Sequence, residues 1–155
     1  MYMYSQYRIQ LREVKVKKQK DITLTRRSLF AASVLFASLV HAEVVVVVGA
    51  KSTTSSLSKE QASDIFLGKA TALTPLDQPE SSSLRDDFYS KVTGKTAAQA
   101  KSYWAKLSFT GKGTPPKEAQ SSTDIKNLVS NNPKLIGYIE KSAVDSSVKI
   151  LFSAQ

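Results

Sequence analysis

Five consecutive valines at positions 44–48 constrain the fold of this chain more than any other feature. β-Branched residues favour strands, and successive side chains of a strand point to opposite faces of a sheet. An unbroken apolar run therefore presents apolar groups on both faces, which is typical of a strand covered on both sides. Because Gly49 and Ala50 end the run, the sequence predicts a short central strand over residues 43–48 with helices packed above and below it.

The segment before this strand reads as an export signal. Residues 1–27 carry eight Lys and Arg against two acidic residues, and an uncharged apolar stretch follows at 28–40. The apolar stretch is followed at Ala42 by a site with small residues that suits cleavage by signal peptidase. A basic region, an apolar region of roughly 13 residues and such a cleavage site are typical of a secretory signal peptide. A transmembrane helix needs about 20 residues, so an uncleaved membrane anchor is the weaker alternative.

We therefore predict that residues 1–42 are a signal peptide cleaved after Ala42 and that residues 43–155 form one periplasmic domain. Arg26 and Arg27 precede the apolar stretch, so both the general secretory route and the twin-arginine route stay open.

Charge and composition then exclude several functions. The whole chain has 22 Lys and Arg, 13 Asp and Glu and a formal net charge of +9. Eight basic and two acidic residues leave with the predicted leader, so 14 basic and 11 acidic residues remain, a net charge of +3. This small excess does not indicate a nucleic-acid-binding surface. The chain has no Cys, and its one histidine, His41, lies in the leader. Because thiol and imidazole groups are then absent, we expect a binding protein without metal or cofactor rather than an enzyme.

Strands and helices alternate along the predicted domain. Ser58 with Gln61 and Thr96 with Gln99 form capping boxes, which mark helix starts. The expected strands are 43–48, 72–76, 135–139 and 148–152, and the expected helices are 58–68, 84–94, 96–107 and a fourth that Ser121 or Ser122 caps. The order β-α-β-α-α-α-β-β predicts an α/β domain of three layers with a mixed central sheet.

Three polar loops, at 51–56, 77–83 and 110–113, are the candidate ligand-binding segments. The first two each leave a strand and enter a helix, and ligands of α/β sheets bind beyond the carboxyl ends of strands. A helix start offers free N–H groups, and Ser and Thr hydroxyls donate to oxyanion oxygens. The candidates are Ser81, Ser82 and Ser83 with Arg85 as counter-charge, then Ser52, Thr53 and Thr54, and last Lys112. In the alternative interpretation the hydroxyls are helix caps and the two basic residues are surface charges.

Several segments together resemble a known family. They are residues 58–69, 83–89, 103–104, 110–117 and 135–138, and the blocks 65–69 and 136–138 are the most specific. These segments resemble phosphate ABC transporter substrate-binding proteins of the periplasmic binding protein-like superfamily. The resemblance implies that fold, inorganic phosphate or a similar oxyanion as ligand, and an ABC permease or another envelope protein as partner.

The resemblance also implies which loop would hold the anion. The family's phosphate loop reads roughly Arg-x-x-x-Ser-Gly-Thr at a helix start, and residues 77–83 match it. Ser81 matches the family's Ser, Ser82 and Ser83 replace Gly and Thr, and Asp77 stands at the Arg position.

Full-length members close two lobes over phosphate, whereas residues 43–155 suffice for one. A lone lobe leaves its anion facing water, so tight binding would need a second protomer, a partner domain or a closing loop. The second hypothesis is an envelope interaction module with a decayed ligand site, which Asp77 and Glu80 favour.

Overall fold

The computed structural model describes residues 42–155, so residues 1–41 of the predicted signal peptide lie outside the described part. In chain order the elements are β1 (Val44–Gly49), α2 (Lys59–Phe66), β2 (Thr74–Asp77), α3 (Ser83–Phe88), the π-helical segment η1 (Tyr89–Thr93), α4 (Ala97–Phe109), β3 (Lys117–Glu118), α5 (Ser122–Asn131), β4 (Leu135–Glu140), the 3-10 turn η2 (Lys141–Ala143) and β5 (Val148–Ala154). None of the described helices is both long and apolar enough to cross a membrane.

The strands form one mixed sheet in the order β3-β2-β4-β1-β5. Strand β1 is antiparallel to both β4 and β5, whereas β2 is parallel to β4 and β3. Because β1 and β2 therefore run in opposite directions, their carboxyl ends lie at opposite ends of the sheet. The α/β class with a mixed sheet is confirmed.

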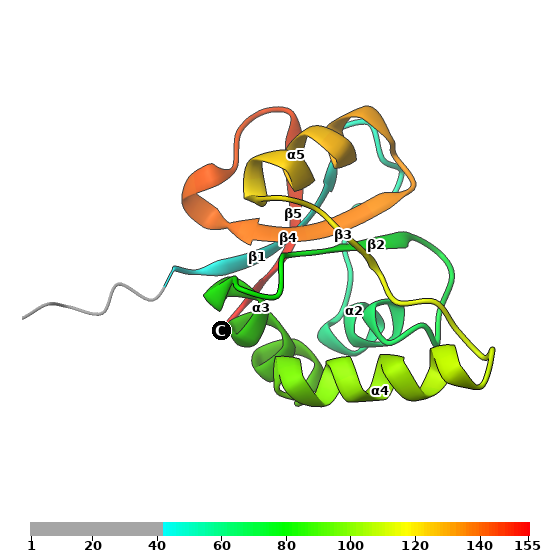
Figure 1. Cartoon of the computed structure of the whole chain (residues 1–155). Helices are drawn as coiled ribbons and strands as arrows, with labels where there is room; N and C mark the ends of the chain where they lie inside the picture. Colours follow the sequence, from blue (N-terminus) through cyan, green and yellow to red (C-terminus); the bar gives the residue numbers. More distant parts are fainter. Residues whose placement is uncertain (1–41) are drawn as a thin grey trace, which may run out of the picture. The chain divides into compact units, whose positions relative to one another are not determined.

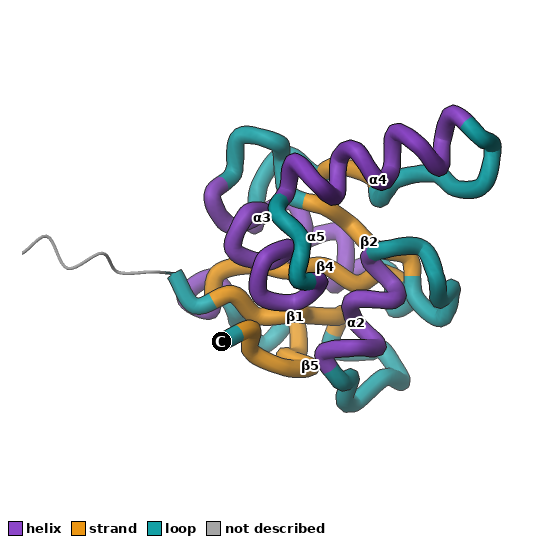
Figure 2. Tube along the Cα trace, turned by 90° about the horizontal axis from the view of Figure 1, so that it is seen from below, coloured by secondary structure: helices purple, strands orange, loops and turns teal. Residues whose placement is uncertain are grey.

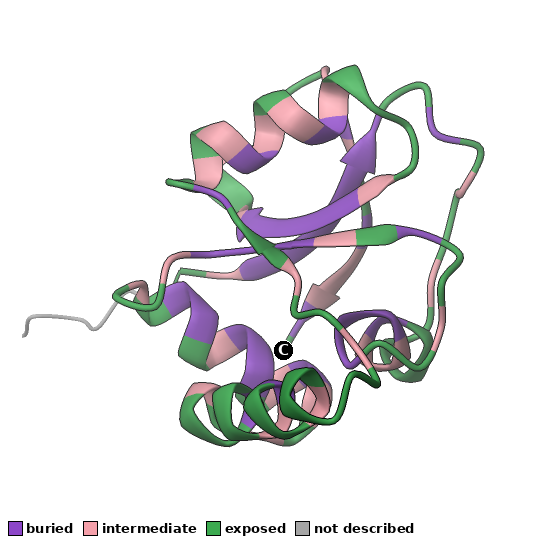
Figure 3. Ribbon diagram, turned by 45° about the vertical axis from the view of Figure 1, so that its right-hand side comes forward, coloured by how far each residue is buried: buried purple, intermediate pink, exposed green. Residues whose placement is uncertain are grey.

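The valine run of β1 builds a core on each side of the sheet. Val44, Val46 and Val48 pack with residues of α2, α3, η1 and α4. Val45 and Val47 pack with residues of α5 on the other side. Figure 1 shows α5 above the sheet and α2, α3 and α4 below it, and Figure 3 shows the buried strands between them. All five valines are fully buried, so the prediction of three layers is confirmed.

Helix α5 can approach the sheet because two strand positions have no side chain. A Cβ added at Gly137 of β4 would lie 2.4 Å from Cγ2 of Ile125, and one added at Gly49 would lie 2.2 Å from the carbonyl oxygen of Val129. Both helix residues are fully buried. These glycines therefore set how closely the upper layer packs.

Helix starts follow the predicted chemistry at three of the four α-helices in the described part of the chain. Ser58 and Thr96 form complete capping boxes at α2 and α4, and the hydroxyl of Ser121 accepts a hydrogen bond from the backbone N–H of Asp124 at α5. Gly68 and Gly94 follow the first two helical segments with positive φ angles of 69° and 68°. Glycine adopts this left-handed conformation without steric cost, so both helices end where predicted.

Two predictions about strands were wrong in detail. The second strand lies at Thr74–Asp77 rather than 72–76, and β3 (Lys117–Glu118) was not predicted. Strand β3 pairs only with Leu76 and Asp77, while Pro75 pairs with β4 at the start of β2. A two-residue strand exists only through its partner, and no local sequence pattern predicts it. Pro75 is tolerated because no β3 residue pairs with it.

Candidate functional site

The loop that the sequence favoured lies between β2 and α3. We call residues 79–83 the serine loop. Ser81 and Ser83 are exposed, and Ser82 is half-buried at the N-cap position of α3. Unlike the caps of the other α-helices, Ser82 makes no side-chain capping bond. Within the described residues, none of these three hydroxyls has a hydrogen-bond partner, so all three are available to an acceptor or donor from outside.

A buried polar cluster lies beside this loop. We call it the Asp77 cluster, and its members are Asp77, Gln78, Arg85, Tyr89 and Tyr138. Both tyrosine hydroxyls donate to the carboxylate of Asp77, that of Tyr138 to Oδ1 and that of Tyr89 to Oδ2 at 2.9 Å. The backbone N–H of Gln78 also donates to Oδ1 at 2.9 Å. Asp77 is 1% exposed, and four groups, including Arg85, surround its two oxygens.

Arg85 reaches this carboxylate from the first turn of α3. Its Nη2 lies 3.1 Å from Oδ2 of Asp77, and its Nη1 lies 2.6 Å from Oε1 of Glu118 on β3. Nη1 also donates to the carbonyl oxygen of Gln78 at 3.2 Å. Two carboxylates therefore balance the single positive charge of Arg85. Its Nε is buried and has no hydrogen-bond partner among the described residues.

The electrostatics follow from burial. Burial raises the pKa of Asp77 above its ordinary value, and the hydrogen bonds and Arg85 only partly oppose this. Burial would lower the pKa of Arg85, but the carboxylates of Asp77 and Glu118 outweigh it and leave that pKa raised. Burial and the nearby Asp77 also raise the pKa of Tyr89 and of Tyr138, so both remain hydrogen-bond donors at neutral pH.

Aromatic packing and Gln78 hold the cluster in place. The ring of Phe88 stacks on Tyr138 with centroids 3.9 Å apart and planes 3° apart. The side-chain Nε2 of Gln78 donates to the carbonyl oxygen of Tyr138 at 3.1 Å and to the hydroxyl of Ser122 at 2.9 Å. The cluster thus joins β2, α3, β4 and the start of α5.

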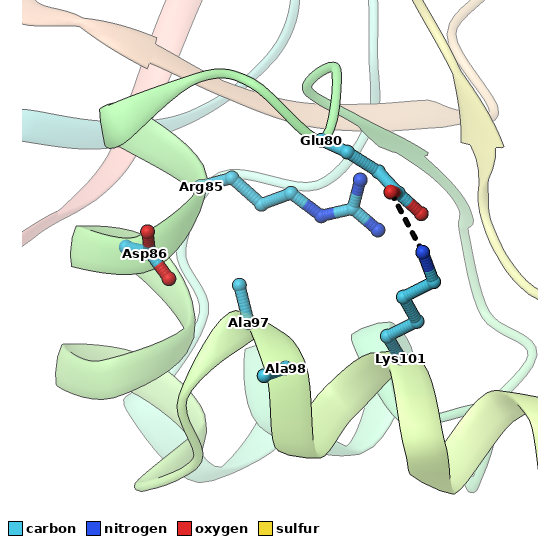
Figure 4. Close-up of a pocket in the computed structure, with 6 residues that line it drawn as sticks. All are labelled: Glu80, Arg85, Asp86, Ala97, Ala98 and Lys101. Carbon is cyan, nitrogen blue, oxygen red and sulfur yellow. Dashed lines mark hydrogen bonds and ion pairs between the residues drawn. The ribbon is translucent and has the colours of Figure 1, made fainter.

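An open cavity of about 260 Å³ lies between the serine loop, α3 and the start of α4 (Figure 4). Its charged lining residues are Glu80, Arg85, Asp86 and Lys101, with Ala97 and Ala98 from the first turn of α4. Nζ of Lys101 lies 2.8 Å from Oε2 of Glu80. Figure 4 shows Arg85 extending across the cavity toward this ion pair. The cavity contains both charge signs and is not a purely basic pocket.

The other predicted site residues lie elsewhere. Ser52, Thr53 and Thr54 follow the carboxyl end of β1, which the sheet topology places at the end opposite the serine loop. Ser52 is buried, and its backbone carbonyl accepts a hydrogen bond from Lys149. Lys112 is exposed in the loop after α4, beside Trp104 and the start of β2. The structure therefore brings Arg85 close to the serines but not the other four residues.

Most of the Asp77 cluster could not be predicted from the sequence. Asp77 was expected in the loop, but this residue ends β2 and is buried. Tyr89 and Tyr138 lie in the resembling segments, but neither was a predicted site residue, and no sequence pattern indicated Glu118 or Lys101. One cue was present: a buried tyrosine hydroxyl needs a partner, and an acidic residue at a strand end can be that partner. No group of three or more His, Cys, Asp or Glu in the described part could hold a metal ion.

The comparisons with known proteins agree with this geometry at the level of the fold. No protein-family model matches the chain, and no curated protein does. Among solved structures, a candidate phosphate ABC transporter substrate-binding protein from Clostridium perfringens, determined with bound phosphate, aligns at a TM-score of 0.58 and 24% identity over 70% of this chain. An ABC-type phosphate transport receptor from Vibrio cholerae aligns at 0.56 and 22% over 70%, and PstS from Borrelia burgdorferi aligns at 0.52 and 14% over 70%.

This chain spans less than half of each of those proteins, namely 44%, 45% and 46% of their lengths. At these identities the likeness concerns the fold. The mixed five-stranded sheet with helices on both faces is therefore the periplasmic binding protein-like fold found in phosphate ABC transporter substrate-binding proteins.

Proposed function

We propose that this protein binds phosphate or a similar small oxyanion at the serine loop and performs no chemistry on it. One observation carries the proposal: Ser81, Ser82 and Ser83 present three hydroxyls without partners in the described residues, in a domain with the fold of phosphate-binding receptors. Hydroxyls donate well to the oxygens of a tetrahedral anion. The three other α-helices use their Ser or Thr for capping, so the open serines of α3 are a local exception.

Burial of Asp77 removes an obstacle to this proposal. Asp77 stands where the resembling family has a basic residue, and an exposed carboxylate there would repel an anion. Instead its charge is compensated inside the protein by Arg85 and by the hydroxyls of Tyr89 and Tyr138. Glu80, the exposed acid within the serine loop, is paired with Lys101, and Asp86 in the first turn of α3 is a second exposed acid near the loop.

The affinity should be low. Arg85 is balanced by two carboxylates, so the binding energy comes mainly from hydrogen bonds that compete with water. Each such bond contributes about 1 kcal/mol net, and a dissociation constant near 1 mM corresponds to about −4 kcal/mol. A second protomer or a partner domain that covers the loop would tighten binding by excluding water.

Export and transport complete the proposal. Residues 1–42 would direct the chain to the periplasm and be removed after Ala42. There the domain would hand its anion to an ABC permease or to another envelope protein. The fold of the solved phosphate receptors supports this assignment.

The test is calorimetry with inorganic phosphate on a protein of residues 43–155, whose described cores lie within that range. We expect weak binding that is lost in the double variant Ser81→Ala with Ser83→Ala. Ser90→Ala, a change of an exposed serine in η1, is the matched control and should bind as the unaltered protein does. Absence of heat up to about 10 mM phosphate, about tenfold above a dissociation constant of 1 mM, would refute the proposal.

A second candidate function is an envelope interaction module without a ligand. The observation that favours it is the charge balance around the serine loop: Arg85 is paired with Asp77 and Glu118, and Lys101 is paired with Glu80. No uncompensated positive charge is left in the cavity between α3 and α4. The same calorimetry decides between the two, since the module predicts no phosphate binding in any variant.

A further inference from the structure

A second hollow lies at the other end of β2 from the serine loop. It is a groove of about 420 Å³ between the end of α2, the start of β2, α4 and the loop that leads to β3. Its walls include Ile65, Leu73, Trp104, Leu107, Pro115 and Pro116. The proposed phosphate site uses none of these residues. The groove is larger than the cavity beside the serine loop and is mainly apolar.

The charge in this groove has one sign. Lys112 and Lys117 line it, and no acidic residue is among the described residues that do so. Both lysines are exposed, and neither has an ion-pair partner within 4.0 Å in the described part of the chain. Two unpaired cations at the rim of an apolar groove favour an occupant that carries carboxylates.

Trp104 forms part of the groove wall and has an unused polar group. Its side chain is almost fully buried, and its indole N–H makes no hydrogen bond to another described residue. Two glycines make room for the ring: a Cβ on Gly68 would lie 2.5 Å from Cη2, and one on Gly113 would lie 3.2 Å from Cζ3. The two glycines therefore let the buried ring of Trp104 lie against the wall of the groove.

Phe109, near the end of α4, is exposed but does not line the groove. It is 92% exposed and lies two positions after the lining residue Leu107, so its side chain points to a different face of α4. Figures 1 and 2 show that the C-terminal end of α4 extends beyond the sheet. The groove itself is therefore defined by its buried and half-buried apolar walls and by the two lysines.

From these contacts we infer that the groove of Trp104, Lys112 and Lys117 binds an acidic peptide segment of a partner protein. Apolar side chains of that segment would enter the hollow, and its carboxylates would pair with the two lysines. A lipid surface fits less well, because a bilayer contacts projecting side chains such as Phe109 but does not fill a concave groove.

Trp104 makes the test direct, since it is the single tryptophan of the sequence. The probe is an acetylated, amidated hexapeptide of alternating leucine and glutamate, titrated into the full protein while tryptophan fluorescence and calorimetric heat are recorded. We expect saturable binding with a shift of the emission maximum. The same peptide with lysine in place of glutamate should bind at least about tenfold more weakly, because its charge repels the groove.

The variants locate the site. Lys112→Glu with Lys117→Glu should weaken binding of the acidic peptide by about tenfold or more. Lys51→Glu with Lys59→Glu makes the same charge change at two exposed lysines outside the groove and should leave binding unchanged. Phe109→Ala should alter neither binding nor the urea midpoint, because this side chain is exposed and does not line the groove.

Three results would overturn the inference. They are no fluorescence change and no heat with the acidic peptide, equal binding by the two lysine double variants, or binding to phosphatidylglycerol vesicles in the absence of peptide binding. Phosphate binding is read separately through Ser81→Ala with Ser83→Ala. A failure to bind phosphate would therefore leave the peptide result unaffected, and a failure to bind the peptide would leave the phosphate result unaffected.

Discussion

The Asp77 cluster and the serine loop are neighbours in sequence but differ in burial and in hydrogen bonding. In the cluster, each oxygen of a fully buried carboxylate is satisfied by tyrosine hydroxyls, a backbone N–H or Arg85. In the loop, three serine hydroxyls are exposed or half-buried and have no partner in the described residues. In one region both carboxylate oxygens are paired, with Nε of Arg85 as the one buried group left without a partner among the described residues, and in the other region the hydroxyls are available.

This difference shows that the residue type does not assign the role. An arginine beside a serine-rich helix start suggests a charge for an anion, yet here it neutralises a buried carboxylate. The cluster should therefore determine stability, and the loop should determine binding. Four predictions test that division.

Removing the central carboxylate should have the largest effect. Asp77→Ala leaves Arg85 buried beside two donor hydroxyls, and breaking a buried pair costs about 3–5 kcal/mol. We expect the free energy of unfolding, measured with urea, to fall by that amount. Ser83→Ala is the control from the loop and should change it by less than about 0.5 kcal/mol. Similar values for the two variants would contradict the division.

A smaller loss is expected from one hydroxyl of the cluster. Tyr138→Phe removes the hydrogen bond to Asp77 and should lower the free energy of unfolding by about 1.5–3 kcal/mol, since the acceptor is charged. The control is Tyr103→Phe, whose half-buried hydroxyl donates to the neutral carbonyl of Leu67 at 2.9 Å. That change should cost about 1 kcal/mol. An equal loss of unfolding free energy in both variants would mean that the hydrogen bond from Tyr138 to Asp77 is no stronger than one to a neutral acceptor.

Helix caps give the next comparison. Thr96→Ala removes a capping box at α4 and should cost about 1 kcal/mol. Ser82→Ala occupies the same position at α3 but removes no capping bond, so its effect on thermal or urea unfolding should be close to zero. If Ser82→Ala proves as costly as Thr96→Ala, the hydroxyl caps α3 in solution and is not available to an anion.

The smallest effect is a difference in pH dependence between Asp77 and Glu80. Burial raises the pKa of Asp77 in the folded protein, so the part of the stability that is linked to its titration is fully present below its ordinary pKa of 3.8 and is lost as pH rises through the folded value. The ion pair with Lys101 lowers the pKa of Glu80, so its contribution is present above 4.5 and is lost as pH falls through the folded value.

Urea unfolding of Asp77→Asn and Glu80→Gln across acid pH measures both slopes. The first variant should lose a decline of stability with rising pH, and the second should lose a rise. Changes of slope of the same sign, each relative to the unaltered protein, would show that burial does not raise the pKa of Asp77 in the folded protein.

Most of the fold could be predicted from local patterns. Capping boxes at Ser58 and Thr96, the glycines that end helices and the apolar periodicity are properties of short segments, and each was found near its predicted position. Strand β3 could not be predicted, because two exposed residues pair only where β2 happens to lie. The strand directions likewise depend on pairing between distant segments, so the opposite positions of Ser52 and Ser81 were not visible in the sequence.

The candidate site could be predicted only in part. The hydroxyls of residues 81–83 and the proximity of Arg85 follow from adjacency in the chain. Pairing of Asp77 with Tyr138 spans 61 positions, and pairing of Arg85 with Glu118 spans 33. Such contacts have no local signal, so an arginine that is balanced by carboxylates looks the same in sequence as one that is free.

What the sequence by itself determined was the covered central strand, the alternation of strands with helices and the serine-rich helix start, because each depends on side chains a few positions apart. The tertiary structure alone decided which polar groups are buried and paired, and which remain open to a ligand or a partner. The reason is physical: burial brings distant residues together and makes every unpaired charge costly, so their partners are set by packing and not by order along the chain.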